Sequence, residues 1–282
     1  MSNLFLMPKT AADSKYPETI LNIDRAALRP LPIKEGFTPQ SEISLQSFIA
    51  QVWISHSWRV RQDVDEKVNW GEAFKGNRDY LQWLNYCVLE QSDDRIIPYM
   101  RSRDGSGESD LKGRGSICPG GHTDFVDAVH SRSVIDLEST AILNLARELW
   151  EECQFTKDGK NITLQTLQIL EDGSRSRLAE EINTLEQALE FLQALGTLHH
   201  EGYLFDNTDN VGRLHLGVCW RLRLHEGITA VSREKGVDFI DPVLPVNLAF
   251  AYPNVTFENW SKLYLEYLSD SESVRNNVSV LA

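Results

Sequence analysis

Three closely spaced glutamates are the residues of this sequence best suited to chemistry. Glu148, Glu151 and Glu152 lie three and four positions apart, and side chains at that spacing share one face of an α-helix. Like charges there repel one another, by roughly a few tenths of a kcal/mol per pair in water and by more when shielded from it. A divalent cation would remove this repulsion, because Mg²⁺ binds carboxylate oxygens and keeps waters for a phosphate-bearing substrate.

A helix must position these glutamates, and residues 139–153 give the strongest helix signal in the chain. Ile142 and Leu149 belong to an apolar face on the side opposite to the glutamates. Arg147 precedes Glu151 by one turn and can pair with it. An acidic helix face is by itself most often a solvated surface, so the surrounding sequence must decide whether this one does chemistry.

The segment around this helix resembles the signature of the MutT/Nudix hydrolase family. That signature is a glycine, five residues, a glutamate, seven residues and then Arg-Glu-U-x-Glu-Glu-x-Gly-U, in which U is apolar. Residues 147–155 match the second half at every defined position except its glycine, and Gly120 and Gly121 lie upstream. The resemblance covers residues from about 120 to about 155, and the predicted strand order around them agrees with it.

Two departures from the signature stand out. The last glycine is Gln154 here, and because glycine suits a left-handed residue at a helix end, we expect this helix to end differently. The first glutamate of the signature has two candidates. Asp127 has the expected spacing from Gly121, whereas Glu138 is one residue too far from Arg147. The segment between them is an insertion, and either acid could pair with the arginine.

The resemblance implies a role for each matched residue. In the family, the glutamates corresponding to Glu151 and Glu152 bind a divalent metal, Mg²⁺ or Mn²⁺, and the one corresponding to Glu148 binds metal or acts as a base. A backbone carbonyl at Gly120 or Gly121 adds a ligand. The implied reaction is attack of a metal-activated water on the diphosphate bond of a nucleoside diphosphate linked to another group. The implied catalytic residues are Glu148, Glu152 and Arg147, and the implied metal ligands are Gly120, Gly121, Glu148, Glu151 and Glu152.

The general base of this reaction is left open. Some family members draw the base from a later loop, where Glu226, Glu234 and Asp238 follow a long predicted strand. Each of them is more often simply a solvated carboxylate. His215 alternates with Arg213 on that strand, and this favours a cross-strand partner over a base.

A basic loop before the two glycines is the candidate phosphate site. Arg101, Arg103 and Arg114 lie there, and guanidinium groups hold phosphates through forked hydrogen bonds. The alternative is a flexible basic loop without phosphate contacts. His122, Asp124 and His130 farther along have no usual metal-ligand spacing and favour a polar surface loop.

Charge and composition exclude several classes of partner. The chain has 282 residues, with 28 basic and 41 acidic side chains, and a net charge of −13. Such a balance argues against stable nucleic-acid binding and against adsorption to anionic membranes. The sequence predicts no membrane-spanning segment and no signal peptide. We expect the four scattered cysteines to be reduced thiols. We therefore expect a cytoplasmic protein that binds a small molecule. Whether it forms a homodimer is left open.

The order of predicted elements indicates a mixed α+β fold. Residues 80–90 and 95–101 are predicted as the two strands of a hairpin. Strands before and after a strong helix predict an α+β or mixed α/β fold. The resemblance implies a Nudix-type α/β/α sandwich with a mixed sheet over residues 79–282, and residues 1–78 are expected to be a partly helical extension packed on this core. Further strands are expected at 116–121, 162–170 and 211–224, and helices after Ser41, at 184–195 and at 257–268.

Two other functions fit the same residues less well. A Nudix-fold module could bind or sense a nucleotide without cleaving it, although a pure binder has no need of all three helix carboxylates. A diphosphate isomerase on this fold would place a cysteine in a Cys-Ser-His-Pro context. Cys118 is followed by Pro119 and Gly120, so that motif is absent.

Overall fold

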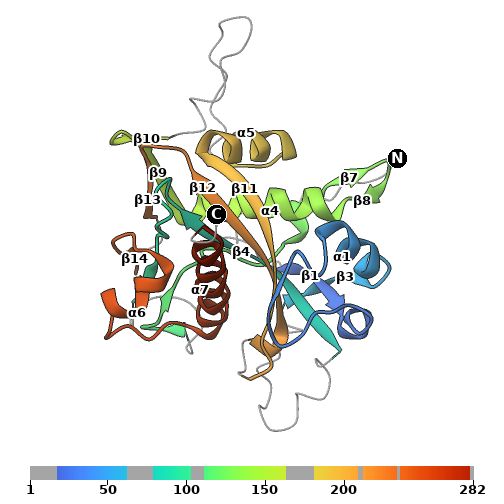
Figure 1. Ribbon diagram of the computed structural model, residues 1–282. Coiled ribbons are helices and arrows are strands. Elements are labelled where there is room, and N and C mark those ends of the chain that lie inside the picture. Colours follow the sequence, from blue (N-terminus) through green and yellow to red (C-terminus); the bar gives the residue numbers. More distant parts are fainter. Residues whose placement is uncertain are drawn as a thin grey trace, which may run out of the picture.

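A six-stranded mixed sheet forms the centre of the fold (Figure 1). The computed structural model describes residues 18–61, 79–102, 111–162, 181–208, 212–233 and 236–279. The strands lie in the order β2-β11-β12-β4-β1-β3, with β4 and β12 parallel and the other neighbours antiparallel. Their bounds are β1 Thr19–Asp24, β2 Gly36–Pro39, β3 His56–Val60, β4 Tyr80–Glu90, β11 Gly196–Phe205 and β12 His215–Leu224.

Short strands form smaller sheets beside the central one. Among the described residues there are three of them, in the orders β14-β5-β6, β10-β9-β13 and β7-β8. The sheet β14-β5-β6 contains the strand that precedes the two glycines. The sheet β10-β9-β13 begins directly at the end of the acidic helix. The bounds are β5 Tyr99–Arg101, β6 Gly115–Ser116, β7 His130–Ser131, β8 Val134–Ile135, β9 Cys153–Lys157, β10 Lys160–Asn161, β13 Ile228–Ser232 and β14 Val237–Phe239.

Helices cover both faces of the central sheet (Figure 1). Side chains alternate along a strand, so Trp83 and Leu89 of β4 face one core while Tyr86 and Val88 face the other. No helix of the described segments is long and apolar enough to cross a membrane. This arrangement confirms the predicted mixed α+β fold with a mixed sheet. The first core contains α1 Leu45–Val52, α4 Leu137–Glu152 and α5 Leu185–Leu195, and the second contains α7 Asn259–Ser279.

The predicted hairpin of residues 80–90 and 95–101 forms only at its turn, where the N–H of Gln91 donates to the carbonyl of Arg95 and that of Ile97 donates to the carbonyl of Leu89. β4 pairs with β12 and β1, whereas β5 pairs with β6 and β14. The two segments share one isolated bridge, between Glu90 and Ile96. Pro98 follows shortly after and has no N–H to extend a ladder. The predicted strand 162–170 lies outside the described residues, apart from Ile162.

The chain before residue 79 supplies strands to the central sheet. β1 and β3 form one end of the sheet and β2 forms the other. Helix α1 begins at Leu45, because Ser44 rather than the predicted Ser41 is its cap: the Ser44 hydroxyl accepts a hydrogen bond from the N–H of Ser47 at 3.2 Å. Phe48 on this helix is fully buried.

Phe48 offers a test of how firmly this region is packed. Its ring lies against Trp83 of β4 and Tyr203 of β11, with centroid distances of 5.3 and 4.5 Å. Replacing it by alanine should lower the free energy of unfolding by about 3–5 kcal/mol, because a large cavity is left in the core. Urea denaturation would measure the change. Ile54→Ala is the control, because Ile54 is 85% exposed, and its effect should be within about 0.5 kcal/mol; equal effects would contradict the packing.

Candidate active site

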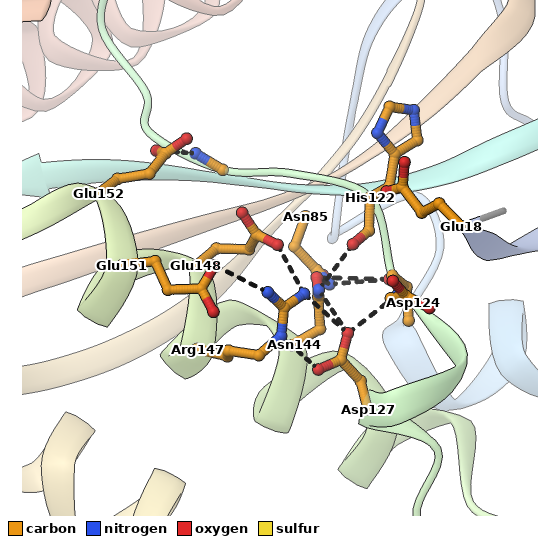
Figure 2. A network of polar contacts seen from close by, with 12 residues as sticks. Glu18, Asn85, His122, Asp124, Asp127, Asn144, Arg147, Glu148, Glu151 and Glu152 are labelled. Carbon is orange, nitrogen blue, oxygen red and sulfur yellow. Dashed lines mark hydrogen bonds and ion pairs between the residues drawn. The ribbon is translucent and has the colours of Figure 1, made fainter. Parts of the chain in front are cut away.

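Arg147 is the centre of a cluster of carboxylates (Figure 2). Its Nε and Nη2 donate to the two carboxylate oxygens of Asp127 at 2.7 and 3.1 Å. Nη2 also donates to Glu148 at 2.6 Å, and Nη1 donates to Glu151 at 3.0 Å. Burial lowers the pKa of Arg147, but Glu148 and Asp127 raise it by more, so it lies well above its ordinary value. The guanidinium is therefore a permanent cation that holds three acids.

Asp127 is one of the two acids that the sequence offered as partners of Arg147. It ends a 3-10 helix at Phe125–Asp127, and its side chain accepts from the N–H of Asp124 at 2.9 Å. The Asp127 side chain is 1% exposed. Glu138 lies nine residues before Arg147, which places it on the opposite side of the helix. The structure thus pairs Arg147 with Asp127, and the insertion folds back to deliver this acid.

A buried amide network joins helix α4 to β4 and to the loop after the glycines. Asn144 donates to the backbone carbonyl of His122 and to Asp127, both at 2.8 Å. Asn85 donates to the Asn144 side chain at 2.6 Å and accepts from the indole N–H of Trp220 at 2.9 Å. Sequence reasoning missed Asn85. The available signal was an asparagine in an otherwise apolar strand, because buried polar groups need partners.

The two glycines run along β4 and turn toward helix α4. The carbonyls of Pro119 and Gly121 accept from the N–H groups of Cys87 and Asn85. Because backbone groups alternate in such pairing, the N–H and carbonyl of Gly120 point away from β4. Its N–H donates to Glu152 at 3.1 Å. Of the two carbonyls predicted as metal ligands, that of Gly121 is used in pairing with Asn85, which leaves that of Gly120 as the candidate.

Close approach requires a glycine at position 120 and favours one at position 121. Gly120 has φ +151°, and a Cβ there would overlap the backbone carbonyl of Asn85. A Cβ at Gly121 would overlap the carboxylate of Glu148. Any other residue type would push the loop off the strand or the carboxylate off the loop.

Burial shifts the titration of Glu148. It raises the pKa of this carboxyl to about 7, although Arg147 beside it acts in the opposite direction. Glu148 therefore carries a charge that its surroundings compensate incompletely.

The donor chemistry of the site fits a hard divalent cation. The Gly120 carbonyl and the carboxylates of Glu148 and Glu152 are oxygen donors of the kind that Mg²⁺ and Mn²⁺ prefer. In the structure Arg147 and the Gly120 N–H hold these carboxylates. Within the described segments, no three His, Cys, Asp or Glu side chains are grouped closely enough to hold a metal ion. A cation at Oε1 of Glu148 or Oε2 of Glu152 would compete with Arg147 or with the Gly120 N–H.

The predicted phosphate contacts are only partly visible. Arg101 lies on β5, donates to the Tyr99 hydroxyl at 2.8 Å and lines a cavity together with Gly120. Arg114 lies just before β6 and is half-buried. Arg103 lies outside the described residues.

The candidate bases from the later loop lie at the surface or cannot be placed. Glu226 and Asp238 are exposed, and Glu234 lies outside the described residues. His215 is the direct cross-strand neighbour of Gln82, and its Nε2 lies 3.1 Å from the Gln82 side-chain oxygen. It also lies 3.2 Å from Nε2 of His122.

The end of helix α4 explains Gln154. The helix ends at Glu152, and Cys153 already has extended dihedral angles, φ −119° and ψ 136°. β9 starts at that residue, so the chain enters a strand without a left-handed residue. The expectation of a different helix end is confirmed, and no glycine is needed at position 154.

Among the comparisons with known proteins, one with a solved structure supports the fold. No protein-family model and no curated protein matches the sequence. The crystal structure of Tm1382, a presumed Nudix hydrolase, is similar with a TM-score of 0.57 and 18% identity over 89% of this chain and 98% of that one. The crystal structure of a NUDIX hydrolase from Alicyclobacillus acidocaldarius has a TM-score of 0.35 and 16% identity, over 67% of this chain and 90% of that one. The likeness to Tm1382 shows a Nudix-type fold.

The ion pair between Arg147 and Asp127 can be tested against the other candidate acid. Asp127→Ala should lower the free energy of unfolding by about 3–5 kcal/mol, because it leaves a buried cation with one partner fewer. Glu138→Ala should cost less than about 1 kcal/mol, the scale of a charge near a helix N-terminus. Chemical denaturation of both variants gives the comparison, and similar losses would contradict the assignment.

Restoring the family's glycine should not help this protein. Gln154→Gly should lower the free energy of unfolding by about 0.5–1 kcal/mol, because glycine loses more conformational freedom in a strand. Gln154 also donates to the carbonyl of Phe155 at 3.0 Å. The change can be read from the thermal midpoint, and a gain in stability would show that the helix end is strained.

Proposed function

We propose that this protein is a Nudix-type hydrolase that cleaves a diphosphate bond, using Mg²⁺ or Mn²⁺, in a nucleoside diphosphate linked to another group. The observation that carries the proposal is the placement of Glu148 and Glu152 against Gly120 and Gly121, with Arg147 held by Asp127. The Nudix-type fold supports it.

The residues of the cluster have separable roles in this proposal. Glu148 and Glu152, with the Gly120 carbonyl and the more exposed Glu151, would hold the cation. The cation would supply charge neutralisation of the diphosphate and a more acidic bound water. Arg147 keeps the glutamates oriented, and the raised pKa of Glu148 lets it take up a proton near neutral pH.

The substrate side of the proposal rests on the arginines near the glycines. Arg101 and Arg114 flank the strand pair β5-β6, and with Arg103 they would balance the charge of a phosphate-bearing small molecule. We also propose that the protein works in the cytoplasm, because its four cysteines are buried free thiols.

A second candidate is a nucleotide-binding or sensing module without turnover. It is favoured by one observation: Glu148 and Glu151 are both ion-paired to Arg147. If a cation cannot displace the guanidinium, the site would bind a nucleotide and leave it intact.

A phosphate-release screen separates the two candidates. Purified protein would be incubated with a panel of nucleoside diphosphate derivatives in Mg²⁺, Mn²⁺ or EDTA. Metal-dependent cleavage of one class would establish the hydrolase. Absence of cleavage together with ligand-induced thermal stabilisation would favour the binding module.

Glu152 provides the test of the proposed mechanism. Glu152→Gln should lower turnover at least about a hundredfold, the scale for loss of one electrostatic group at a reacting centre, and leave the thermal midpoint nearly unchanged. Glutamine keeps the shape and can still accept from the Gly120 N–H. Glu186→Gln on the exposed start of α5 is the matched control. Full activity of the Glu152 variant would overturn the mechanism.

A further inference from the structure

A cavity lies on the α7 side of the central sheet, on the face opposite to the packing face of α4. It encloses about 520 Å³, its open mouth included. Leu84 and Tyr86 of β4 form its floor, since these residues belong to or pack against the core under α7. Trp260 at the start of α7 forms one wall. The cavity is therefore bounded mainly by flat or apolar side chains.

This cavity adjoins the glutamate cluster through Gly120. Gly120 lines the cavity, and its N–H holds Glu152. Arg101 lines the same cavity. A ligand with its phosphates at Gly120 and Arg101 would therefore extend its remaining part toward α7.

Glu258 presents a carboxylate oxygen without a partner to this cavity. Its Oε1 accepts from the Tyr86 hydroxyl at 2.8 Å, from the Ser261 hydroxyl at 3.2 Å and from the Ser116 hydroxyl. Its Oε2 has no hydrogen-bond partner among the described residues, and Glu258 lines the cavity. This oxygen is open to the cavity, so a donor of a bound ligand can reach it.

Asn259 adds a second acceptor beside Glu258. Its amide nitrogen donates to Asp206 and to the Thr208 hydroxyl, both at 3.0 Å. Because Asp206 is a carboxylate and can only accept, this fixes which end of the amide is the nitrogen. The amide oxygen has no hydrogen-bond partner within the described segments, and Asn259 lines the cavity.

The walls of the cavity suit a planar ring. The rings of Trp260 and Tyr86 meet edge to face with centroids 5.5 Å apart, and Leu84 and Leu111 complete the apolar lining. Aromatic and apolar walls stabilise a flat ring by contact, and the two neighbouring acceptors would orient it.

We propose that this cavity binds a nucleobase whose edge carries two adjacent N–H donors, as guanine does, and that Glu258 is the residue that selects it. The proposal rests on the proposed function, because it places the phosphates of the same ligand at Gly120 and Arg101. The negative charge of Glu258 disfavours the reverse orientation, with phosphates beside α7. Asn259 assists as the second acceptor.

The proposal is tested by binding rather than by turnover. Titration calorimetry in EDTA would compare GMP with IMP, which lacks the amino group of guanine, and with ribose 5-phosphate. The wild-type protein should bind GMP about tenfold or more tightly than IMP, the scale of one hydrogen bond to a charged acceptor. Glu258→Gln should abolish this preference. The matched control Glu266→Gln, at an exposed position on α7, should keep it.

Three other outcomes overturn the proposal. If Glu258→Gln lowers the affinity for GMP and for IMP equally, Glu258 has a purely structural role in anchoring α7. Ribose 5-phosphate binding as tightly as GMP would assign the acceptors to sugar hydroxyls. If no nucleotide binds, the cavity is not a base site, and the phosphate-release screen still decides the proposed function independently. If the variant does not fold, the comparison of GMP with IMP in the wild-type protein remains decisive.

Discussion

The candidate site depends on one buried cation. Arg147 is 17% exposed, and a guanidinium in such surroundings must be paired on several sides to remain there. Asp127 supplies the most buried partner, and its position requires the turn at Phe125–Asp127. The turn at Phe125–Asp127 also determines the path of the loop that follows Gly121. A single charge requirement thus fixes a helix face, an insertion and a glycine loop together.

The proposed cation and the ion pair of Arg147 would compete at Glu148. Oε1 of Glu148 accepts from Arg147, so a cation bound to that oxygen would weaken the ion pair. Burial has already made the charged form of Glu148 costly, as its raised pKa shows. The described site is therefore an ion-paired cluster, and the proposed divalent cation would have to displace Arg147 from Glu148.

Local pattern was sufficient for some elements and insufficient for others. The helix at α4, the strand at β12 and the glutamate face follow from periodicity, which neighbouring residues carry by themselves. The partner of a strand depends on residues far away in the sequence, which is why the predicted hairpin from β4 ends at its turn and β4 pairs with β1 and β12 instead. Asp127 stayed undecided for the same reason: whether an insertion returns to Arg147 depends on its folded path. Asn85 was missed because its partners, Asn144 and Trp220, come from distant segments.

The position of the N-terminal strands has a consequence for the order of folding during synthesis. β2 pairs only with β11 within the central sheet, and β1 needs β3 and β4. β2 is therefore made early and paired late, since residues 196–205 must leave the ribosome before it has its neighbour β11, whereas β1 finds both of its partners by residue 90. Pairing over such sequence separations is slow. Until then the chain carries open strand edges, which are the surfaces most prone to association with other chains.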